Sequence, residues 1–304
     1  MKIAVVILHY RNLADTLECL ESLNRQDHSN FEIIFVDNGS QDPNVEDAVK
    51  HFPRLFFVRN ETNLGFAEGN NVAIRLALKR GAEGVLLLNN DTVCSRHLLT
   101  VFAEAAQTYP EAAAFGAKIF FYDDPTVIWH AGGNVHPLTL RCYHDGCPDS
   151  DLEKKWEKVR DIGYACGCAL FVKSEAIKDV GLMAPEFFLI WEEIDWCWRL
   201  RKAGYRCLYI PEAKVWHKIS RSFEGGNRGA LWQYYYFRNR LLFLKRNFPL
   251  SKRIHFYLTR FPKELLELIF LSCSPKATHT QKKLNRAALK GITHYVLRRF
   301  GRGC

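Results

Sequence analysis

The sequence predicts an α/β protein built on a mostly parallel sheet with helices on both faces. Short apolar runs without helical periodicity, typical of strands buried on both faces, recur through the first ninety residues. Helical segments separate them, and this alternation favours parallel strands joined by right-handed crossovers. No Gly-x-Gly-x-x-Gly follows the first run, which argues against an NAD-type dinucleotide fold. With 304 residues, 48% of them hydrophobic, the chain can bury a large core without disulfides or a metal.

The first half of the chain alternates strands and helices regularly. Strands are expected at residues 3–8, 31–36, 55–58 and 86–88. The first connecting helix is expected to be capped by Asn12 or Asp15, the second to open at Asp42-Pro43, and the third to end at Gly81.

The second half is less regular. Residues 122–160 are polar, aromatic and punctuated by Gly and Pro, and such long loops are where substrate specificity tends to lie. Around them we expect a helix at 98–109, strands at 112–121, 127–130 and 165–172, a helix from Ser174 to Gly181, a helix from about 192 to 204 and a short strand ending at His217.

The positive charge belongs to the C-terminal part of the chain. Residues 240–304 hold 15 Lys and Arg but only two acidic residues, whereas the chain as a whole has a net charge of +9. Helices are expected near 232–240, 251–272 and 281–299, and none has the roughly 20 unbroken apolar residues needed to span a bilayer. Basic amphipathic helices favour an anionic membrane surface. A solvated helical cap is the alternative, and nucleic-acid binding is not expected.

The cysteines indicate a reducing compartment. None of the ten forms a C-x-x-C pair, which makes a zinc site improbable, and Met1-Lys2 runs directly into the first apolar strand instead of a signal peptide. We therefore expect a cytoplasmic protein that is peripheral on the inner face of the cytoplasmic membrane.

Polar residues stand where the strands end. In open α/β sheets ligands bind beyond the carboxyl ends of the strands. Asn89-Asn90-Asp91 offers oxygen atoms that suit Mg²⁺ or Mn²⁺ shared with substrate phosphates, unless it is simply a turn. Asp37 can accept hydrogen bonds from a ribose or a base, or can form an Asx turn. His217 becomes a candidate metal ligand only if it folds back onto Asp91.

Two further segments carry candidate residues. In the stretch from Asn63 to Asn71, glycines at a helix start let the backbone approach a polar or anionic group. Glu192, Glu193 and Asp195 follow an aromatic run at another helix start, where acids complement the helix dipole but can also include a partly desolvated general base. Because Glu193 and Asp195 are two residues apart, one can face a ligand while the other pairs with Arg199 or Arg201.

Taken together, the ordered motifs resemble the family 2 glycosyltransferases of the GT-A fold, and most closely the bacterial rhamnosyltransferase-like enzymes. The resemblance spans about residues 1–240. It rests on His9-Tyr10-Arg11-Asn12, Asp37-Asn38-Gly39-Ser40, Asn63-Leu64-Gly65-Phe66 with Gly69-Asn70-Asn71, Asn89-Asn90-Asp91-Thr92, Trp191-Glu192-Glu193-Ile194-Asp195 followed by Arg199, and His217.

This resemblance implies an inverting, metal-dependent transfer of a sugar, either rhamnose or another hexose. The donor would be a UDP- or dTDP-sugar, and the acceptor a saccharide or lipid-linked saccharide in cell-surface polysaccharide synthesis. Residues 1–225 would form the catalytic domain, with a nucleotide-binding half (1–120) and an acceptor half (121–225), and 226–304 a basic helical extension.

The resemblance also assigns roles. Glu193 would be the general base, with Asp195 the second choice, and Asp91 and His217 would bind Mg²⁺ or Mn²⁺. The donor would contact His9, Tyr10, Asp37, Asn63, Gly65, Phe66, Asn70 and Asn90. Trp191, Glu192 and Arg238 would lie on the acceptor side. Asn89 replaces the first Asp of the family's Asp-x-Asp, and Glu193 replaces the usual Asp of its Glu-Asp pair.

Two alternatives stay open at this point. A sugar-nucleotide pyrophosphorylase has a similar sheet but would need a Gly-rich, basic loop where this chain has His9-Tyr10-Arg11-Asn12. A catalytically silent nucleotide-sugar-binding subunit at the membrane is compatible with the departures at Asn89 and Glu193.

Overall fold

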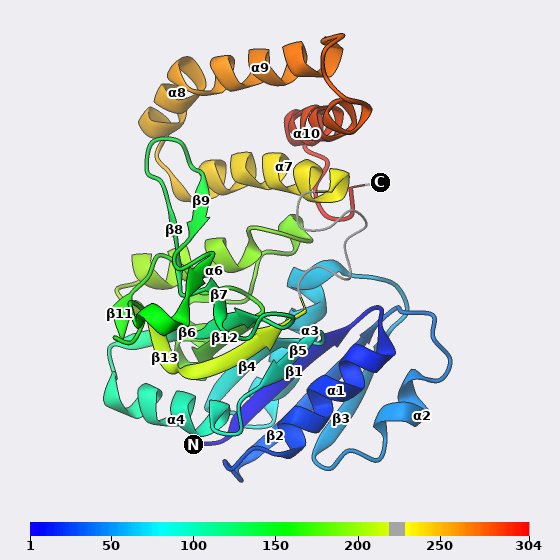
Figure 1. Ribbon diagram of the computed structural model, residues 1–304, viewed down its shortest axis with the longest axis vertical. Helices are drawn as coiled ribbons and strands as arrows, with labels where there is room; N and C mark the ends of the chain where they lie inside the picture. Colours follow the sequence, from blue (N-terminus) through cyan, green and yellow to red (C-terminus); the bar gives the residue numbers. More distant parts are fainter. Residues whose placement is uncertain (219–228, 304) are drawn as a thin grey trace.

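The expected α/β fold is confirmed by a computed structural model, which describes residues 1–218 and 229–303. A large central sheet lies between helices, and a helical layer formed by the C-terminal part covers one end of this body (Figure 1). The main strand order is β10-β7-β6-β12-β4-β1-β2-β3.

The first half forms the parallel part of the sheet. Strands β1 (Ile3–His9), β2 (Phe31–Asn38), β3 (Leu55–Asn60) and β4 (Gly84–Asn89) are parallel to one another, and α1 (Leu13–Asn24), α2 (Val45–Val49) and α3 (Gly65–Lys79) connect them. Alternate β1 residues enter two different cores, since Val5 and Ile7 face the side of α1 whereas Ala4 and Val6 face the side of α3. The carboxyl ends of these strands therefore share one edge.

The second half adds antiparallel strands. β12 (Ala169–Lys173) runs antiparallel between β4 and β6 (Ala112–Phe121), and β13 (Arg206–His217) runs parallel to β6 and antiparallel to β5 (Thr92–Cys94). The remaining elements are β7 (Val127–His130), β8 (Gly133–Val135), β9 (Cys142–His144), β10 (Asp149–Ser150), β11 (Arg160–Asp161), α4 (Leu98–Thr108), α5 (Ser174–Val180) and α6 (Glu192–Lys202).

Several predicted element starts need correction. Asn12 precedes α1 in a left-handed conformation and its side chain makes no capping hydrogen bond. Helix α2 starts at Val45 because the Asp42 carboxylate accepts from the backbone N–H of Asn44 in a turn. Strand β12 starts at Ala169, four residues later than predicted, because the N–H of Ala169 donates to the carbonyl of Cys166 and closes a turn.

The C-terminal extension consists of α7 (Ala230–Asn247), α8 (Leu250–Thr259), α9 (Phe261–Cys273) and α10 (His279–Val296). The prediction of one helix over 251–272 is wrong, because Pro262 has no N–H to continue a helix and restricts the residue before it. Helices α7 and α10 pack at backbone distance, since a Cβ on Gly291 would lie 2.3 Å from the carbonyl oxygen of Tyr234. The predicted domain boundary at residue 225 lies outside the described residues.

Candidate active site

Asp91 and His217 meet at the carboxyl edge of the sheet. The pairing of β13 with β5 sets His217 opposite Thr92, and His217 Nε2 lies 3.1 Å from Asp91 Oδ1. Both residues are buried. Burial alone would raise the pKa of Asp91, but the adjacent His217 and Lys218 and a backbone hydrogen bond bring it below its ordinary value. The condition under which His217 becomes a candidate ligand is therefore met.

These two side chains fit a shared divalent ion. An octahedral ion with ligands at about 2.1 Å separates adjacent ligand atoms by about 3 Å, close to the spacing of Asp91 Oδ1 and His217 Nε2. Nδ1 of His217 is buried and has no hydrogen-bond partner among the residues that the structure describes. Over residues 1–218 and 229–303, no cluster of three or more His, Cys, Asp or Glu side chains could hold a metal, so the other ligands would come from substrate and water.

Asp37 is held by its own turn and by a neighbouring strand. Its Oδ1 accepts from the N–H of Ser40, three residues on, at 3.0 Å, and its Oδ2 accepts from Arg59 Nε at 3.1 Å. Arg59, to which the sequence analysis gave no role, is the last but one residue of β3 and lies beside Asp37 in register. An ionised carboxylate has about four lone-pair sites, so a contact to a ribose or base stays open as a prediction.

Asn90 and His9 tie β1, α1 and β4 together. The Asn90 amide donates to the carbonyl of Arg11 at 3.0 Å and to the Thr16 hydroxyl at 2.8 Å, and His9 Nδ1 contacts that same hydroxyl at 2.8 Å. Burial lowers the pKa of His9, which favours the neutral ring. Tyr10 lies under the guanidinium of Arg11, 5.3 Å from the ring centre.

Some of the backbone N–H groups at the start of α3 that were expected to bind a ligand are bonded to the protein instead. The N–H groups of Phe66 and Ala67 donate to the carbonyl of Phe188, so two of the donors predicted for an anion already have a protein partner. Asn63 caps the N–H of Gly65 at 2.8 Å, and the amide of Asn70 donates to the carbonyl of Phe66. Gly65 has φ +79°, and a Cβ there would clash with Phe188, so the glycine serves this packing.

Glu193 carries a buried carboxyl oxygen without a protein partner. Its residue as a whole is only half-buried, but Oε2 is fully covered and makes no hydrogen bond within the described structure. Burial raises the pKa of Glu193 to about 7. A carboxyl group of this kind exchanges protons near neutral pH, which is what a general base requires.

Glu192 and Trp191 lie beside it but are more enclosed. Both are buried, and Glu192 Oε2 and the Trp191 indole N–H lack partners among the described residues. Burial and then the charge of Glu193 raise the pKa of Glu192 well above its ordinary value. Of the two carboxyl groups, Glu192 is the more enclosed, and the residue of Glu193 is only half-buried.

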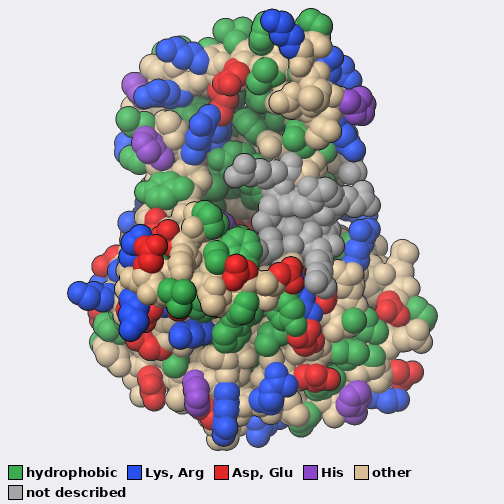
Figure 2. Space-filling model, viewed as in Figure 1, with side chains coloured by type: hydrophobic (Ala, Val, Ile, Leu, Met, Phe, Trp, Pro, Cys, Tyr) green, Lys and Arg blue, Asp and Glu red, His purple; other side chains and the backbone are tan. Residues whose placement is uncertain are grey.

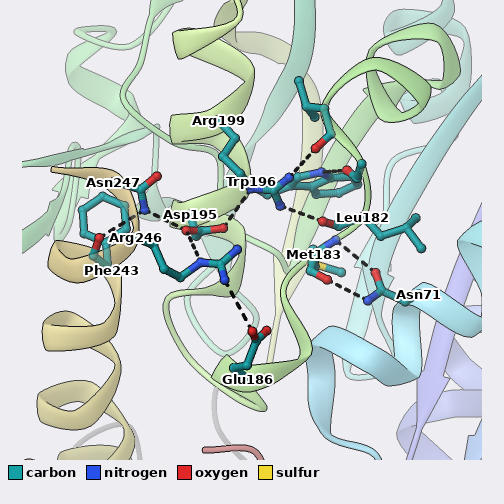
Figure 3. A network of polar contacts seen from close by, with 12 residues as sticks. Asn71, Leu182, Met183, Glu186, Asp195, Trp196, Arg199, Phe243, Arg246 and Asn247 are labelled. Carbon is teal, nitrogen blue, oxygen red and sulfur yellow. Dashed lines mark hydrogen bonds and ion pairs between the residues drawn. The ribbon is translucent and has the colours of Figure 1, made fainter. Parts of the chain in front are cut away.

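Asp195, the second choice for the general base, is engaged by three other side chains. Asp195 is fully buried, its Oδ2 accepts from Arg199 Nε at 2.9 Å, and its Oδ1 accepts from the Asn247 amide at 2.7 Å and from Arg246 (Figure 3). Asp195 is thus the acid that pairs with Arg199, and Glu193 keeps a carboxyl oxygen without a partner among the described residues.

Arg238, predicted on the acceptor side, is entirely committed to the protein. It is fully buried, and its guanidinium donates to Asn239 Oδ1 and to the carbonyls of Glu186, Phe187 and Gly301. The structure therefore does not leave it free to bind an acceptor.

A short turn separates the two halves of the site. In Cys166-Gly167-Cys168, the carbonyl of Cys168 accepts from the N–H of Asn89 at 2.9 Å, and a Cβ on Gly167 would lie 3.0 Å from Phe66 and 3.8 Å from Glu193 Cβ. Gly167 thus lies between the sheet edge that carries Asp91 and the side chains of Phe66 and Glu193. The sequence analysis placed this segment in a strand and missed it.

Aromatic side chains that the sequence analysis also missed surround the site. The ring of Trp129 lies 4.9 Å from that of His217 and 5.2 Å from that of His144. Burial and then the charges of Cys142 and Glu193 raise the pKa of Tyr164, whose hydroxyl donates to the carbonyl of Tyr143 at 3.3 Å. The many aromatic residues in 122–164 were the signal in the sequence that could have indicated them. The contact between Trp129 and His217 follows only from the fold.

This fold and this site define a class of protein. A carboxylate and a histidine at the carboxyl edge of a GT-A sheet, with a separate neutral-range carboxyl group across a short turn, are suited to a sugar-transferring enzyme that uses a nucleotide donor. The chain belongs to glycosyl transferase family 2, whose profile matches residues 4–181.

Curated relatives are consistent with a rhamnosyltransferase-like member of the family. The chain is 26% identical over 226 residues to the N-acetylglucosaminyl-diphospho-decaprenol L-rhamnosyltransferase of Mycobacterium tuberculosis, covering 67% of this chain and 71% of that protein. It is 22% identical over 252 residues to the dTDP-rhamnosyl transferase RfbF of Shigella flexneri, covering 80% of each.

Solved structures agree on the fold. GalNAc-T7 with UDP, GalNAc and Mn²⁺ aligns with a TM-score of 0.67 at 13% identity, over 98% of this chain and 56% of that chain. The mannosyltransferase PcManGT from Pyrobaculum calidifontis, in complex with GDP-Man and Mn²⁺, aligns with a TM-score of 0.61 at 14% identity, over 98% and 88%.

Proposed function

We propose that this glycosyltransferase moves a hexose, with rhamnose the first candidate, from a UDP- or dTDP-sugar to a saccharide or lipid-linked saccharide with inversion at the anomeric carbon. One observation supports this proposal more strongly than the others. Burial raises the pKa of Glu193 to about 7 and its buried Oε2 has no hydrogen-bond partner among the described residues, whereas Glu192 is more enclosed and Asp195 is paired with Arg199, Arg246 and Asn247.

The donor half of the site is formed by Asp91 and His217. Together they would hold Mg²⁺ or Mn²⁺ against the diphosphate, and the chemistry that the ion supplies is neutralisation of charge on the leaving group. Asp37 and the adjoining Arg59 lie at the ends of neighbouring strands and are suited to orient the ribose or base. The other donor residues predicted, from His9 to Asn90, shape this edge through the contacts described above.

The acceptor half is formed around Glu193. The acceptor hydroxyl oxygen attacks the anomeric carbon, the bond from that carbon to the diphosphate oxygen breaks, and the hydroxyl proton passes to the Glu193 carboxylate. One displacement with one base inverts the anomeric carbon, and a second carboxylate on the donor face is unnecessary. Glu193 is one methylene longer than Asp, which extends its reach toward the acceptor.

The surface of the C-terminal extension is suited to peripheral binding on an anionic membrane. No described helix is long and apolar enough to cross a bilayer. Large apolar side chains nevertheless stand exposed on α8 and α9, and basic side chains outnumber acidic ones on the visible face of the extension (Figure 2). The exposed apolar group consists of Leu250, Ile254, Leu258, Leu266, Ile269 and Phe270, accompanied by exposed Lys252, Arg260 and Lys263. Buried apolar area plus attraction to anionic lipid would hold these helices at the inner face of the cytoplasmic membrane.

Calorimetric titration tests the donor assignment. The protein is titrated with UDP, dTDP, GDP and ADP, each with and without Mn²⁺. We expect Mn²⁺-dependent binding of UDP or dTDP, followed by transfer from the corresponding sugar nucleotide. Binding without transfer to any saccharide acceptor would instead favour the silent scaffold, and no binding of any nucleotide by folded protein would contradict the donor site.

A further inference from the structure

The loop that leads into Glu192 and Glu193 has a strained backbone. Phe188, Ile190 and Trp191 have φ of +63°, +69° and +85°, although none of them is glycine. At Phe188 the N–H of Leu189 donates to the carbonyl of Phe187 at 2.7 Å, which forms a rare three-residue turn. Such a conformation persists only where surrounding contacts hold it.

Asn239, on α7, provides those contacts. Its amide nitrogen lies 2.8 Å from the carbonyl oxygens of Phe187 and Leu189 and 2.7 Å from that of Ile190. Its Oδ1 accepts from Arg238 Nε at 2.8 Å, which fixes the amide with its N–H groups toward the loop. A single fully buried side chain thus contacts three carbonyls of the segment that ends at the proposed base.

The remaining loop carbonyls are also held. The carbonyl of Glu186 accepts from Arg238 at 3.1 Å and from the N–H of Gly301, and that of Phe188 accepts from the N–H groups at the start of α3. The loop is therefore fixed between α7 on one side and α3 on the other. Asp195, bound to Arg246 and Asn247 near the far end of α7, fixes the following helix α6 in the same way (Figure 3).

We propose that Asn239, oriented by Arg238, is a positioning residue that sets the direction of the Glu193 carboxyl group by holding loop 187–191 in its strained conformation. This inference rests on the proposed role of Glu193 in transfer. It makes α7 a working part of the active site, although α7 lies beyond residues 4–181, the part that the family profile matches.

The test compares Asn239→Ala with Tyr257→Phe. The control substitution removes a hydrogen bond of 3.1 Å between Tyr257 on α8 and Tyr295 on α10, inside the same C-terminal extension, and the ring of Tyr257 packs on Phe256 and Phe261 and not on the loop. We expect Asn239→Ala to lower kcat by roughly 100-fold with little change in the KM for the donor, since small misplacement of a reacting group has effects of this size. We expect Tyr257→Phe to keep kcat. If Asn239→Ala does not fold, Asn239→Ser is measured in its place.

A second readout does not depend on activity. Hydrogen exchange of the backbone is followed in all three proteins. We expect Asn239→Ala to speed exchange in residues 186–193 and at Phe66 and Ala67, and Tyr257→Phe to leave these amides unchanged. Unchanged kcat in Asn239→Ala, or faster loop exchange in both variants alike, would overturn the positioning role. Selective loop exchange in a protein that shows no transfer would leave the positioning contact in place and count against the proposed function instead.

Discussion

His217 and Asp91 are 126 positions apart in the chain, yet their Nε2 and Oδ1 atoms lie 3.1 Å apart at one edge of the sheet. The contact exists because β13 returns along β6 and pairs with the short strand β5 that follows Asp91. Taken separately, Asp91 could simply belong to a turn and His217 could simply be a packed side chain. The fold brings them together as one pair. This pair is the part of the site that would face the leaving diphosphate.

Substitution of Asp91 tests the donor half. We expect Asp91→Asn to weaken the Mn²⁺-dependent binding of UDP or dTDP by roughly 100-fold, because a neutral amide is a poorer ligand for a hard cation. The measurement is calorimetric titration with and without Mn²⁺. The matched control is Asp47→Asn, which alters an exposed carboxylate paired only with Lys50. Equal affinity in wild type and Asp91→Asn would reduce the Asp91–His217 contact to a structural one.

The pH dependence of kcat tests the protonation state of Glu193. Because burial raises the pKa of Glu193 to about 7 and a base must be ionised to accept a proton, kcat should rise as the pH increases through about 7 and then level off. The measurement is kcat at saturating donor and acceptor over about two pH units on either side of neutrality. An acidic limb close to the ordinary glutamate pKa of 4.5 would show that the group which titrates is not buried in this way.

Asp195 is expected to matter for stability instead of proton transfer. Asp195→Ala leaves Arg199 and Arg246 without their buried partner, and the loss of one member of a buried ionic network costs about 3–5 kcal/mol of unfolding free energy. Chemical denaturation measures that loss, and transfer below the unfolding transition should persist. Arg201→Ala, on the same helix, serves as the control. A stable Asp195→Ala protein without transfer would restore Asp195 as the base.

Membrane association should depend on the apolar surface of α8 and α9. We expect the double substitution Leu258→Ser and Phe270→Ser to reduce co-sedimentation with liposomes that contain anionic lipid, since both side chains are about 70% exposed, at 73% and 70%. Binding by the wild type should weaken as salt increases. The matched control, Leu152→Ser, alters a side chain that is 78% exposed outside the extension. Absence of wild-type binding at low salt would contradict the peripheral position.

Much of the scaffold followed from local patterns. The apolar runs placed β1 to β4 within a few residues, and the position of Asp37 and Asp91 at strand ends followed directly from where those runs stop. The break between α8 and α9 was also encoded locally, in Pro262, but the amphipathic pattern across it suggested a single helix. A hydrophobic pattern of this kind indicates which secondary structure a whole segment favours. The point at which a helix ends depends instead on a single residue, here Pro262.

The role of a site residue could be predicted from the sequence only where that role does not depend on contacts with residues far away in the chain. Glu193 and Asp195 have the same charge and nearly the same position, and the difference between them comes from Arg246 and Asn247, which reach Asp195 from α7. Arg238 was placed on the acceptor side by the resemblance alone. Its actual partners are backbone carbonyls of a strained loop, and no property of residue 238 alone indicates where those carbonyls lie.

The most direct test of the account is the rate of sugar transfer by Glu193→Gln, measured alongside donor binding. Glutamine keeps the size of the side chain but cannot accept the proton, so we expect kcat to fall by roughly 10³-fold while calorimetry shows unchanged Mn²⁺-dependent nucleotide binding. Glu175→Gln, an exposed position on α5, should transfer at the wild-type rate. A wild-type rate in Glu193→Gln would contradict the role of Glu193 as the base.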